Sequence, residues 1–288
     1  MRIRYQDGRA RVTGAALDVR LTLCDSAQAF HFVPSGAGYA GRCAGRDVRV
    51  EPAGGGFDIV AARGDLPFWR RYLDLDRDYA NLFAGAPPHP MAGRAIARLP
   101  GLRVLNQPPW EALFQFILSS NNNVARIRSL VRRLSDEFGE RGEMGVAGIP
   151  SPGALIAAGE GALRAAGVGY RARYLIGAAA AVADGFPLSG LASLPLAEAR
   201  KALTGLPGVG DKVADCVLLF GCGHADAFPV DVWVERLMRG WFGEDCGRRA
   251  MGDRGRLRFG ANAGLIQQYL FHCARLGLLE DFESGEAQ

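Results

Sequence analysis

The sequence is poor in lysine. Of its 34 basic residues only Lys201 and Lys212 are lysine, and all the others are arginine. Chemistry that requires a primary amine side chain therefore has two candidates in the whole chain. The sequence also has little excess of one charge, because its 30 acidic residues reduce the net charge to +4. A net charge of this size permits a polyanionic partner without requiring one.

The sequence also lacks segments typical of export or membrane insertion. Charged residues such as Arg2, Asp7 and Arg20 are spread over its N-terminal region, which excludes the apolar core of a signal peptide. No uncharged apolar run approaches the roughly 18 residues that a membrane-spanning helix needs. We therefore expect a soluble intracellular protein without membrane contact.

Familiar metal-binding spacings are missing as well. The six cysteines include no C-x-x-C pair, which argues against a zinc ribbon or an iron–sulphur cluster. The four histidines form no H-E-x-x-H pattern. We expect most of the cysteines to be small buried residues, the histidines to be ordinary surface or core residues, and no cofactor to be required.

What is present indicates two domains. A length of 288 residues with 49% apolar residues allows a sizeable core and, at the usual domain size, two domains. Up to about residue 63, apolar and polar residues alternate in short runs between glycine clusters, as in Leu17–Leu23 and Phe57–Ala61, which predicts a small antiparallel sheet. A helical pattern over Leu66–Phe83 ends at the break Gly85–Pro90. We predict an N-terminal α+β domain over residues 1–95.

The remainder, residues 96–288, is predicted to be helical, which makes the chain mainly α. Apolar spacing predicts helices over Trp110–Leu118 and Val124–Phe138, and Ser151 followed by Pro152 is a typical helix start. The tail 280–288 is expected to be frayed. Further helices are predicted over Gly161–Ala166, Arg171–Ala183, Leu196–Leu203, Lys212–Phe220, Val232–Arg239 and Asn262–Leu276.

The most informative segment is Leu203–Cys216, which reads as a helix end, a glycine hairpin and a new helix start. It is not a nucleotide-binding phosphate loop, because Asp211 precedes the lysine and Val213 replaces the serine or threonine that would hold magnesium. Glycines at 208 and 210 could leave backbone N–H groups free to bind a phosphate of nucleic acid. Taken alone, the pattern could equally be a structural turn.

The pairing of this hairpin with Phe228–Val232, which contains Pro-Val-Asp, resembles the 8-oxoguanine DNA glycosylase family of helix-hairpin-helix DNA glycosylases. In that family the hairpin is followed by a catalytic lysine, and the Pro-Val-Asp motif supplies a catalytic aspartate. Lys212 and Asp231 match these positions. The resemblance extends in the same order to blocks at 119–126, 167–173 and 263–271. It implies a helix-hairpin-helix glycosylase fold with a small antiparallel-sheet domain.

The resemblance gives both residues catalytic roles that suit their chemistry. A neutral lysine amine can attack the sugar C1′ and form a Schiff base, after which β-elimination cleaves the strand. The alternative for Lys212 is an exposed lysine in the first turn of a helix. Asp231 follows Pro-Val as a helix N-cap should, and a carboxylate held in that way can also stabilise an oxocarbenium-like transition state.

Family members hold the damaged base in a pocket outside the DNA stack. The resemblance implies that Phe271 and Cys216 sandwich the base and that Gln267 hydrogen-bonds its edge. A backbone carbonyl at Ala27 is expected to accept the N7 hydrogen that distinguishes 8-oxoguanine from guanine, although the family has glycine there. Taken singly, Phe271 and Cys216 could be core residues and Gln267 a surface residue.

Other positions that match the family are expected to contact the DNA around the damaged base. Asn121, Arg126 and Arg171 match residues that engage the cytosine left behind, and Tyr170 matches a wedge beside it. The alternatives are a polar turn for Asn121 and a solvated face or phosphate contacts for the arginines. Trp233 stands where some members have a phosphate-contacting histidine.

The hairpin itself is expected to contact the DNA backbone through Gly208 and Gly210. As in family members, carbonyls of Thr204, Leu206 and Val209 could hold a structural monovalent or calcium ion.

We therefore expect a bifunctional base-excision-repair glycosylase and AP lyase that excises 8-oxoguanine opposite cytosine. Its partner would be double-stranded DNA containing oxidised guanine, and the enzyme would be a monomer, located in the cytoplasm or nucleoid of a prokaryote or the nucleus of a eukaryote. Two alternatives remain open. One is an alkylated-base glycosylase of the same superfamily, which uses the aspartate alone, and the other is a non-catalytic helix-hairpin-helix DNA-binding protein.

Overall fold

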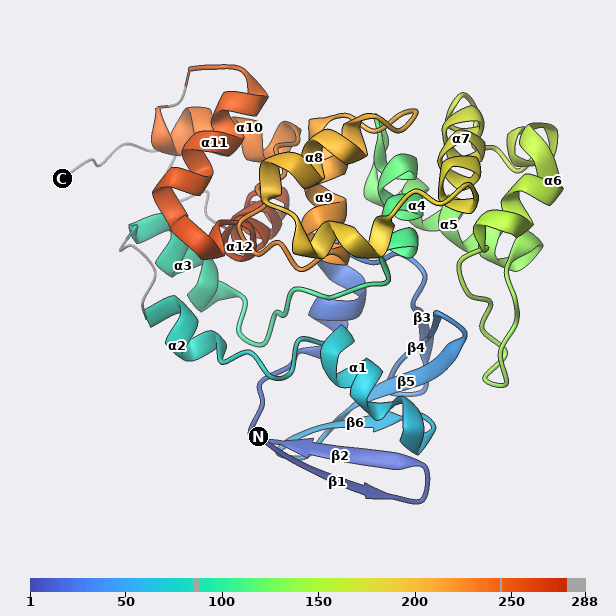
Figure 1. The fold of residues 1–288 in the computed structure, drawn as a ribbon. Coiled ribbons are helices and arrows are strands. Elements are labelled where there is room, and N and C mark those ends of the chain that lie inside the picture. The colour runs from blue at the N-terminus through green and yellow to red at the C-terminus, as the bar shows by residue number, and fades with distance from the viewer. Residues whose placement is uncertain (85–88, 244, 279–288) are drawn as a thin grey trace.

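The computed structural model describes residues 1–84, 89–243 and 245–278. Its N-terminal part contains one antiparallel sheet with the strand order β1-β2-β6-β5-β4-β3 (Figure 1). This confirms the sheet predicted from alternation, including the strand within Phe57–Ala61. The strands are β1 Arg2–Gln6, β2 Arg9–Thr13, β3 Val33–Ser35, β4 Gly38–Cys43, β5 Arg46–Ala53 and β6 Gly56–Val60.

Leu17–Leu23, which we predicted to be part of the sheet, is not a strand. The chain is helical from Val19 and continues into a π-helical turn over Leu21–Asp25. Asp18 starts this turn, since its carboxylate accepts a hydrogen bond from the Leu21 amide at 2.8 Å. Val19 and Leu23 are both buried and lie four residues apart, so the apolar residues follow a helical period as well as an alternating one.

The helix predicted over Leu66–Phe83 is interrupted. It consists of α1 Leu66–Tyr72 and α2 Tyr79–Ala84, separated by a turn in which Asp74 has a left-handed φ of +50°. The Asp74 carboxylate accepts hydrogen bonds from Arg77 and from the Tyr79 hydroxyl, which fixes the turn. Most of the predicted break at Gly85–Pro90 lies outside the described residues, as does the tail 280–288.

The rest of the described chain is helical, as predicted. Gly139 ends α5, and Ser151 caps α6 by accepting a hydrogen bond from the Ala154 amide. The helices are α3 Pro90–Arg98, α4 Pro109–Ser119, α5 Val124–Phe138, α6 Pro152–Ala165, α7 Arg171–Ala183, α8 Leu196–Thr204, α9 Asp211–Gly221, α10 Val232–Phe242, α11 Arg248–Phe259 and α12 Ala263–Leu276. The proposed domain boundary after residue 95 remains a prediction, and it falls inside α3.

Helix α11 was not predicted. Its sequence is mostly arginine and glycine, so it has no apolar stripe at helical spacing. Glycines make up half of its buried face, between Met251 and Phe259, and a Cβ on Gly255 would lie 2.7 Å from the ring of Phe228. A glycine in close contact with an aromatic ring adds nothing to the hydrophobic periodicity of the sequence, so this helix could not be predicted from it.

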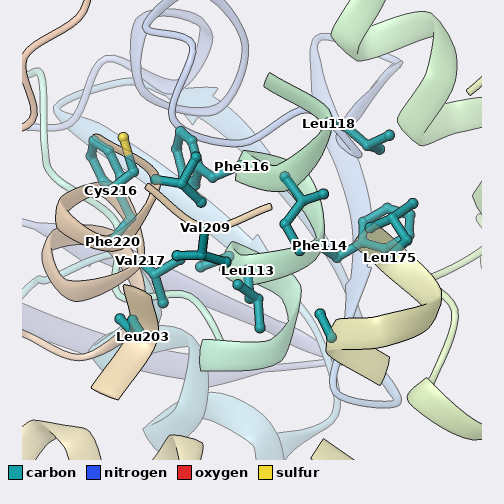
Figure 2. Packing of buried hydrophobic residues seen from close by; sticks show 14 of the residues in the cluster. Leu113, Phe114, Phe116, Leu118, Leu175, Leu203, Val209, Cys216, Val217 and Phe220 are labelled. Atoms are coloured by element: carbon teal, nitrogen blue, oxygen red, sulfur yellow. The ribbon is translucent and has the colours of Figure 1, made fainter. Parts of the chain in front are cut away.

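Two helical cores meet in the middle of the molecule. One core is built around α4 and α9, where the rings of Phe116 and Phe220 stack with centroids 5.2 Å apart (Figure 2). The other joins α3, α10, α11 and α12 on the opposite side of α9 (Figure 1). Phe271 of α12 packs against both cores. No helix within the described part of the chain is long and apolar enough to cross a bilayer.

Candidate active site

A cavity of about 840 Å³ opens where these two helical cores and the N-terminal region meet. It is lined from α4, the loop before α5, the hairpin before α9, the start of α10, and α12. The structure thus brings together side chains that are up to 248 residues apart, from Ala27 to Arg275 (275 − 27 = 248). Nine of the predicted site residues line it: Ala27, Asn121, Gly208, Gly210, Lys212, Cys216, Asp231, Gln267 and Phe271.

Lys212 lies in the first turn of α9 and is half-buried. Its Nζ donates a hydrogen bond to the Ser119 hydroxyl at 2.8 Å and lies 5.3 Å from the centre of the Phe116 ring. Ser119 in turn donates to the Phe116 carbonyl at 2.7 Å, so its lone pairs are directed at the amine. The amine is therefore held at the cavity wall and does not extend into solvent, which excludes the alternative of an ordinary exposed lysine.

Asp231 is the N-cap of α10, as its position after Pro-Val predicts. One carboxylate oxygen, Oδ1, accepts hydrogen bonds from the amides of Trp233 at 3.0 Å and Val234 at 2.9 Å. These bonds fix the carboxylate at the positive end of the helix. Asp231 thus presents a fixed negative charge to the cavity.

Cys216 lies one helical turn after Lys212 and is buried. Burial raises the pKa of its thiol to about 12, with the charge of Lys212 opposing the rise and that of Asp231 adding to it. Cys216 therefore remains a neutral thiol near both charged groups, suited to lie against a base and not to act as a nucleophile.

Gln267 is 4% exposed and carries an unsatisfied acceptor at the cavity. Its Nε2 donates to the Pro229 carbonyl at 3.0 Å, whereas its Oε1 has no hydrogen-bond partner among the described residues. Leaving a buried acceptor unpaired costs about 1–3 kcal/mol. A ligand N–H at this point would remove that cost. Phe271 lies one turn further along α12 on the same cavity wall.

Ala27 enters the cavity from the N-terminal region with a left-handed φ of +58°. Neighbouring residues anchor it to the helical part of the chain. Gln268 of α12 donates to the Ser26 carbonyl at 2.7 Å, and Gln107 donates to the Gln28 carbonyl at 2.6 Å. Ala27 is thus held in a backbone conformation that glycine adopts more easily than alanine.

Two of the predicted opposite-base and wedge residues, Tyr170 and Arg171, contact the backbone carbonyl of Ser120, next to Asn121. Arg171 donates to the Ser120 carbonyl through Nε at 2.8 Å and Nη2 at 2.6 Å, and to the Asn121 carbonyl at 2.8 Å. Tyr170 is 42% exposed and stands over this loop, with its ring 4.6 Å from the Arg171 guanidinium. Arg126 is exposed on the first turn of α5. Asn121, at φ +48°, is the member that lines the cavity.

The hairpin between α8 and α9 is rigidly packed on one side and open on the other. Gly208 has a φ of +76°, and a Cβ on it would lie 2.3 Å from Cγ of Tyr174. Gly210 is the N-cap of α9, and a Cβ there would meet no described atom within 4 Å. A buried ion pair between Arg200 and Asp215, 2.7 Å apart, joins the two helices. Gly210 and the free end of α9 therefore face open space.

The same hairpin carries the carbonyls that could hold an ion. Thr204 is the last residue of α8, where carbonyls lack helical partners. The Leu206 carbonyl accepts a hydrogen bond from the Val209 amide at 3.2 Å and keeps one lone pair. The carbonyl oxygens are the ligand type that calcium or a monovalent cation takes, so the residues fit the expected ion.

Sequence reasoning assigned no role to several residues that shape the site. Ser119 begins a block that resembles the family, but only the structure shows that it holds Lys212. Phe116 and Trp233 also line the cavity, and the Arg236 guanidinium lies 5.3 Å from the Trp233 ring. The helical pattern of α4 gave no signal for Phe116, because the face toward the cavity is as apolar as the rest of that helix.

Comparison with known proteins agrees with this geometry. Residues 114–250 match the model of the HhH-GPD superfamily base excision DNA repair protein, and residues 56–113 match that of the 8-oxoguanine DNA glycosylase N-terminal domain. A probable N-glycosylase/DNA lyase of Methanothermobacter thermautotrophicus is 34% identical over 210 residues, which cover 64% of this chain and 67% of that protein.

Two solved structures are similar over nearly their whole length. MBOgg1, in complex with a low-affinity DNA ligand, has a TM-score of 0.90 at 30% identity and covers 96% of this chain and 98% of its own. The 8-oxoguanine glycosylase/lyase of Clostridium acetobutylicum, in complex with double-stranded DNA containing cytosine opposite 8-oxoguanine, has a TM-score of 0.89 at 28% identity, covering 97% and 99%.

The fold and the cavity thus define a helix-hairpin-helix protein of base-excision DNA repair. Within that class the chain belongs to the 8-oxoguanine DNA glycosylase family. It is accordingly an enzyme, an N-glycosylase with DNA lyase activity.

Proposed function

We propose that this enzyme excises 8-oxoguanine opposite cytosine from double-stranded DNA, through a Schiff base on Lys212. The observation that carries the proposal is the set of side chains that line the cavity. Its lining residues carry an amine, a capped carboxylate and a buried amide oxygen without a partner in the described part of the chain. These groups suit attack at a sugar carbon, stabilisation of a sugar cation and recognition of a base edge.

Asp231 and Lys212 would share the glycosylase step. The C1′–N9 bond breaks and its electron pair leaves with the base, which takes up a proton, while positive charge develops on the sugar. The fixed Asp231 carboxylate stabilises that charge. The neutral Lys212 amine then donates its lone pair to C1′ and loses a proton, and opening of the sugar ring gives the Schiff base.

The lyase step follows from the same intermediate. The Schiff base acidifies the C2′ hydrogens, and loss of one of them as a proton expels the 3′ phosphate by β-elimination. Hydrolysis of the imine then returns the Lys212 amine. Ser119 holds the amine between these steps, because its hydroxyl accepts a hydrogen bond from Nζ and donates one to the Phe116 carbonyl.

The damaged base would be recognised by its hydrogen-bond donors. Gln267 Oε1 accepts an N–H from the Watson–Crick edge of the base, which satisfies the buried acceptor. The Ala27 carbonyl accepts the N7 hydrogen that 8-oxoguanine has and guanine lacks. Phe271 and the neutral thiol of Cys216 supply apolar faces on either side of the base.

The remaining predicted residues would hold the DNA. Tyr170 enters the stack beside the lesion, and Asn121, Arg126 and Arg171 address the cytosine. Arg171 would have to exchange part of its three bonds to backbone carbonyls for the base. We propose that the enzyme acts as a monomer on DNA inside the cell.

At the hairpin, Gly208 and Gly210 would present backbone N–H groups to a phosphate. Carbonyls of Thr204, Leu206 and Val209 would hold a structural monovalent or calcium ion, which supplies positive charge next to that phosphate.

Single-turnover excision assays test this function. Duplexes that carry 8-oxoguanine opposite cytosine, 8-oxoguanine opposite adenine, undamaged guanine, or an alkylated purine are compared at equal DNA occupancy. We expect the first to be cleaved fastest and undamaged guanine to be untouched. Asp231→Asn should keep DNA binding and slow excision by about 100-fold or more. Preferred release of the alkylated purine would instead establish the alternative, an alkylated-base glycosylase.

A further inference from the structure

A second cluster of chemically active side chains lies in the N-terminal half, apart from the active-site cavity. His31 precedes β3, Cys43 is the last residue of β4, and Glu111 lies in the first turn of α4. All three are buried, and a nitrogen, a sulphur and an oxygen from them lie within 4.8 Å of one another. The sequence gave no signal for this cluster, because its members are 12 and 68 residues apart.

The side chain of Gln115 sets the orientation of the His31 ring. The Gln115 amide oxygen accepts from the Phe30 amide at 2.7 Å and lies 3.4 Å from His31 Nδ1. The Gln115 Nε2 donates to the Gln107 side chain and to the Glu111 carbonyl, which fixes the amide orientation. His31 Nδ1 therefore carries the proton, and the lone pair of Nε2 is directed at Cys43 Sγ, 3.0 Å away, from which it can accept a hydrogen bond. This is the arrangement of a metal-binding histidine.

Glu111 has one carboxylate oxygen available as a metal ligand. Its Oε1 accepts from the Ala44 amide at 2.6 Å, which fixes the carboxyl group. Its Oε2 is buried and has no hydrogen-bond partner in the described residues. The Tyr72 hydroxyl is also buried and, over the same residues, equally unpartnered. Its interactions with Cys43 and Glu111 place it next to the cluster.

We propose that His31, Cys43 and Glu111 bind a zinc ion. The donor set of imidazole nitrogen, thiolate and carboxylate is one that zinc takes in proteins. A thiolate and a carboxylate together balance the charge of a divalent cation, so the buried site becomes neutral as a whole.

The role of the ion would be structural. Three protein ligands fill three of the four positions of a tetrahedral zinc shell. The ion would connect the end of β4 to the first turn of α4, the helix that carries Phe116 and Ser119 at its other end. Zinc would thus tie the sheet to the helix that positions Lys212, without taking part in the chemistry.

The experiment measures metal in the full-length protein. Protein produced with added zinc and passed over a desalting column is analysed by mass spectrometry for metals, and we expect about one zinc ion per chain. Cys43→Ser should lose most of this zinc. Cys273→Ser is the matched control, because Cys273 is equally buried but lies in the other helical core. Equal zinc in the two variants would overturn the proposal.

Cobalt substitution keeps the test decisive if Cys43→Ser does not fold. The folded wild-type protein is stripped of zinc and titrated with Co²⁺. We expect a thiolate-to-cobalt charge-transfer band and a tetrahedral d–d spectrum, both reversed by added zinc. Glu111→Gln, which keeps the size of the side chain, should weaken cobalt binding and leave the charge-transfer band in place. Wild-type protein without zinc and without a charge-transfer band would contradict the proposed site.

Discussion

At the scale of single residues, Ala27 is held in a backbone conformation that glycine adopts more easily. Its left-handed φ costs an alanine about 1–2 kcal/mol, while glycine loses roughly 0.5–1 kcal/mol of conformational entropy on folding. We expect Ala27→Gly to raise the free energy of unfolding by about 0.5–1 kcal/mol. Chemical denaturation measures the change, and single-turnover excision should be at least as fast as in the parent.

Ala29 provides the control for that substitution. It is buried two residues away and has no left-handed φ. Ala29→Gly should therefore lower the free energy of unfolding by about 1 kcal/mol, the usual cost of glycine and of a lost buried methyl group. A stabilising effect in Ala29→Gly, or a destabilising one in Ala27→Gly, would contradict the role given to φ at position 27.

At the scale of elements, a substitution at the start of α9 can test DNA binding without changing the stability of the fold. Gly210→Ala adds a methyl group into open space, so we expect the melting temperature to change little. If the N–H groups at this helix start bind a phosphate, the methyl group should weaken binding to undamaged duplex DNA by about tenfold, equivalent to about 1.4 kcal/mol. Fluorescence anisotropy at fixed salt measures this.

Gly208→Ala is the contrasting variant in the same hairpin. Its Cβ would clash with Tyr174, and its φ of +76° strains any other residue, so both stability and DNA binding should fall. Unchanged DNA affinity in Gly210→Ala would show that the hairpin does not contact the DNA backbone.

Elements with one apolar face could be predicted from the sequence. Helix α5 was predicted with its observed bounds, because Ile127, Leu130, Val131 and Leu134 recur at helical spacing and Gly139 follows them. Leu17–Leu23 was misassigned since its apolar residues fit two periods, and only the Asp18 cap decides between them. Helix α11 was missed because glycines make up half of its buried face, which leaves too few apolar side chains to show a helical period.

The candidate site could be predicted where its residues sit in short motifs. Lys212 and Asp231 follow distinctive local patterns, and the structure places them on one cavity. The contact of Ser119 with Lys212 spans 93 residues, and the cluster of His31, Cys43 and Glu111 joins three elements. Such contacts depend on tertiary packing and leave no spacing in the sequence.

At the scale of the whole molecule, α12 connects the N-terminal region to the active site. Arg275 of α12 donates to the Asp25 carbonyl at 2.6 Å, and Gln268 donates to that of Ser26 at 2.7 Å. His272 lies between them on the same helix and is buried. Acid should therefore weaken this connection through His272.

Burial lowers the pKa of His272 to about 4, with Arg275 adding to the shift and Asp25 opposing it. The unfolded chain has an ordinary histidine pKa near 6.5, so the stability from neutral His272 is complete above that pH and is lost as the pH falls toward about 4. We expect the free energy of unfolding to fall by at most about 1.4 kcal/mol per pH unit from this group.

His272→Gln should make the dependence of stability on pH shallower between about pH 6.5 and 4.5. His31 is buried as well, but it is identical in the two proteins, so it does not affect the difference between their curves. Urea denaturation at a series of pH values measures the difference. Parallel curves for the parent and the variant would contradict the account of His272.

The central claim is that Lys212 is the nucleophile, and the scarcity of lysine makes it directly testable. The enzyme is incubated with a duplex that carries 8-oxoguanine opposite cytosine, and borohydride is added to reduce any Schiff base to a stable adduct. Lys201→Gln removes the other lysine, which lies on α8 outside the cavity. We predict full trapping in the parent and in Lys201→Gln, none in Lys212→Gln, and an adduct on Lys212 by peptide mass spectrometry. An adduct that persists in Lys212→Gln, or none in the parent despite excision, would contradict the account.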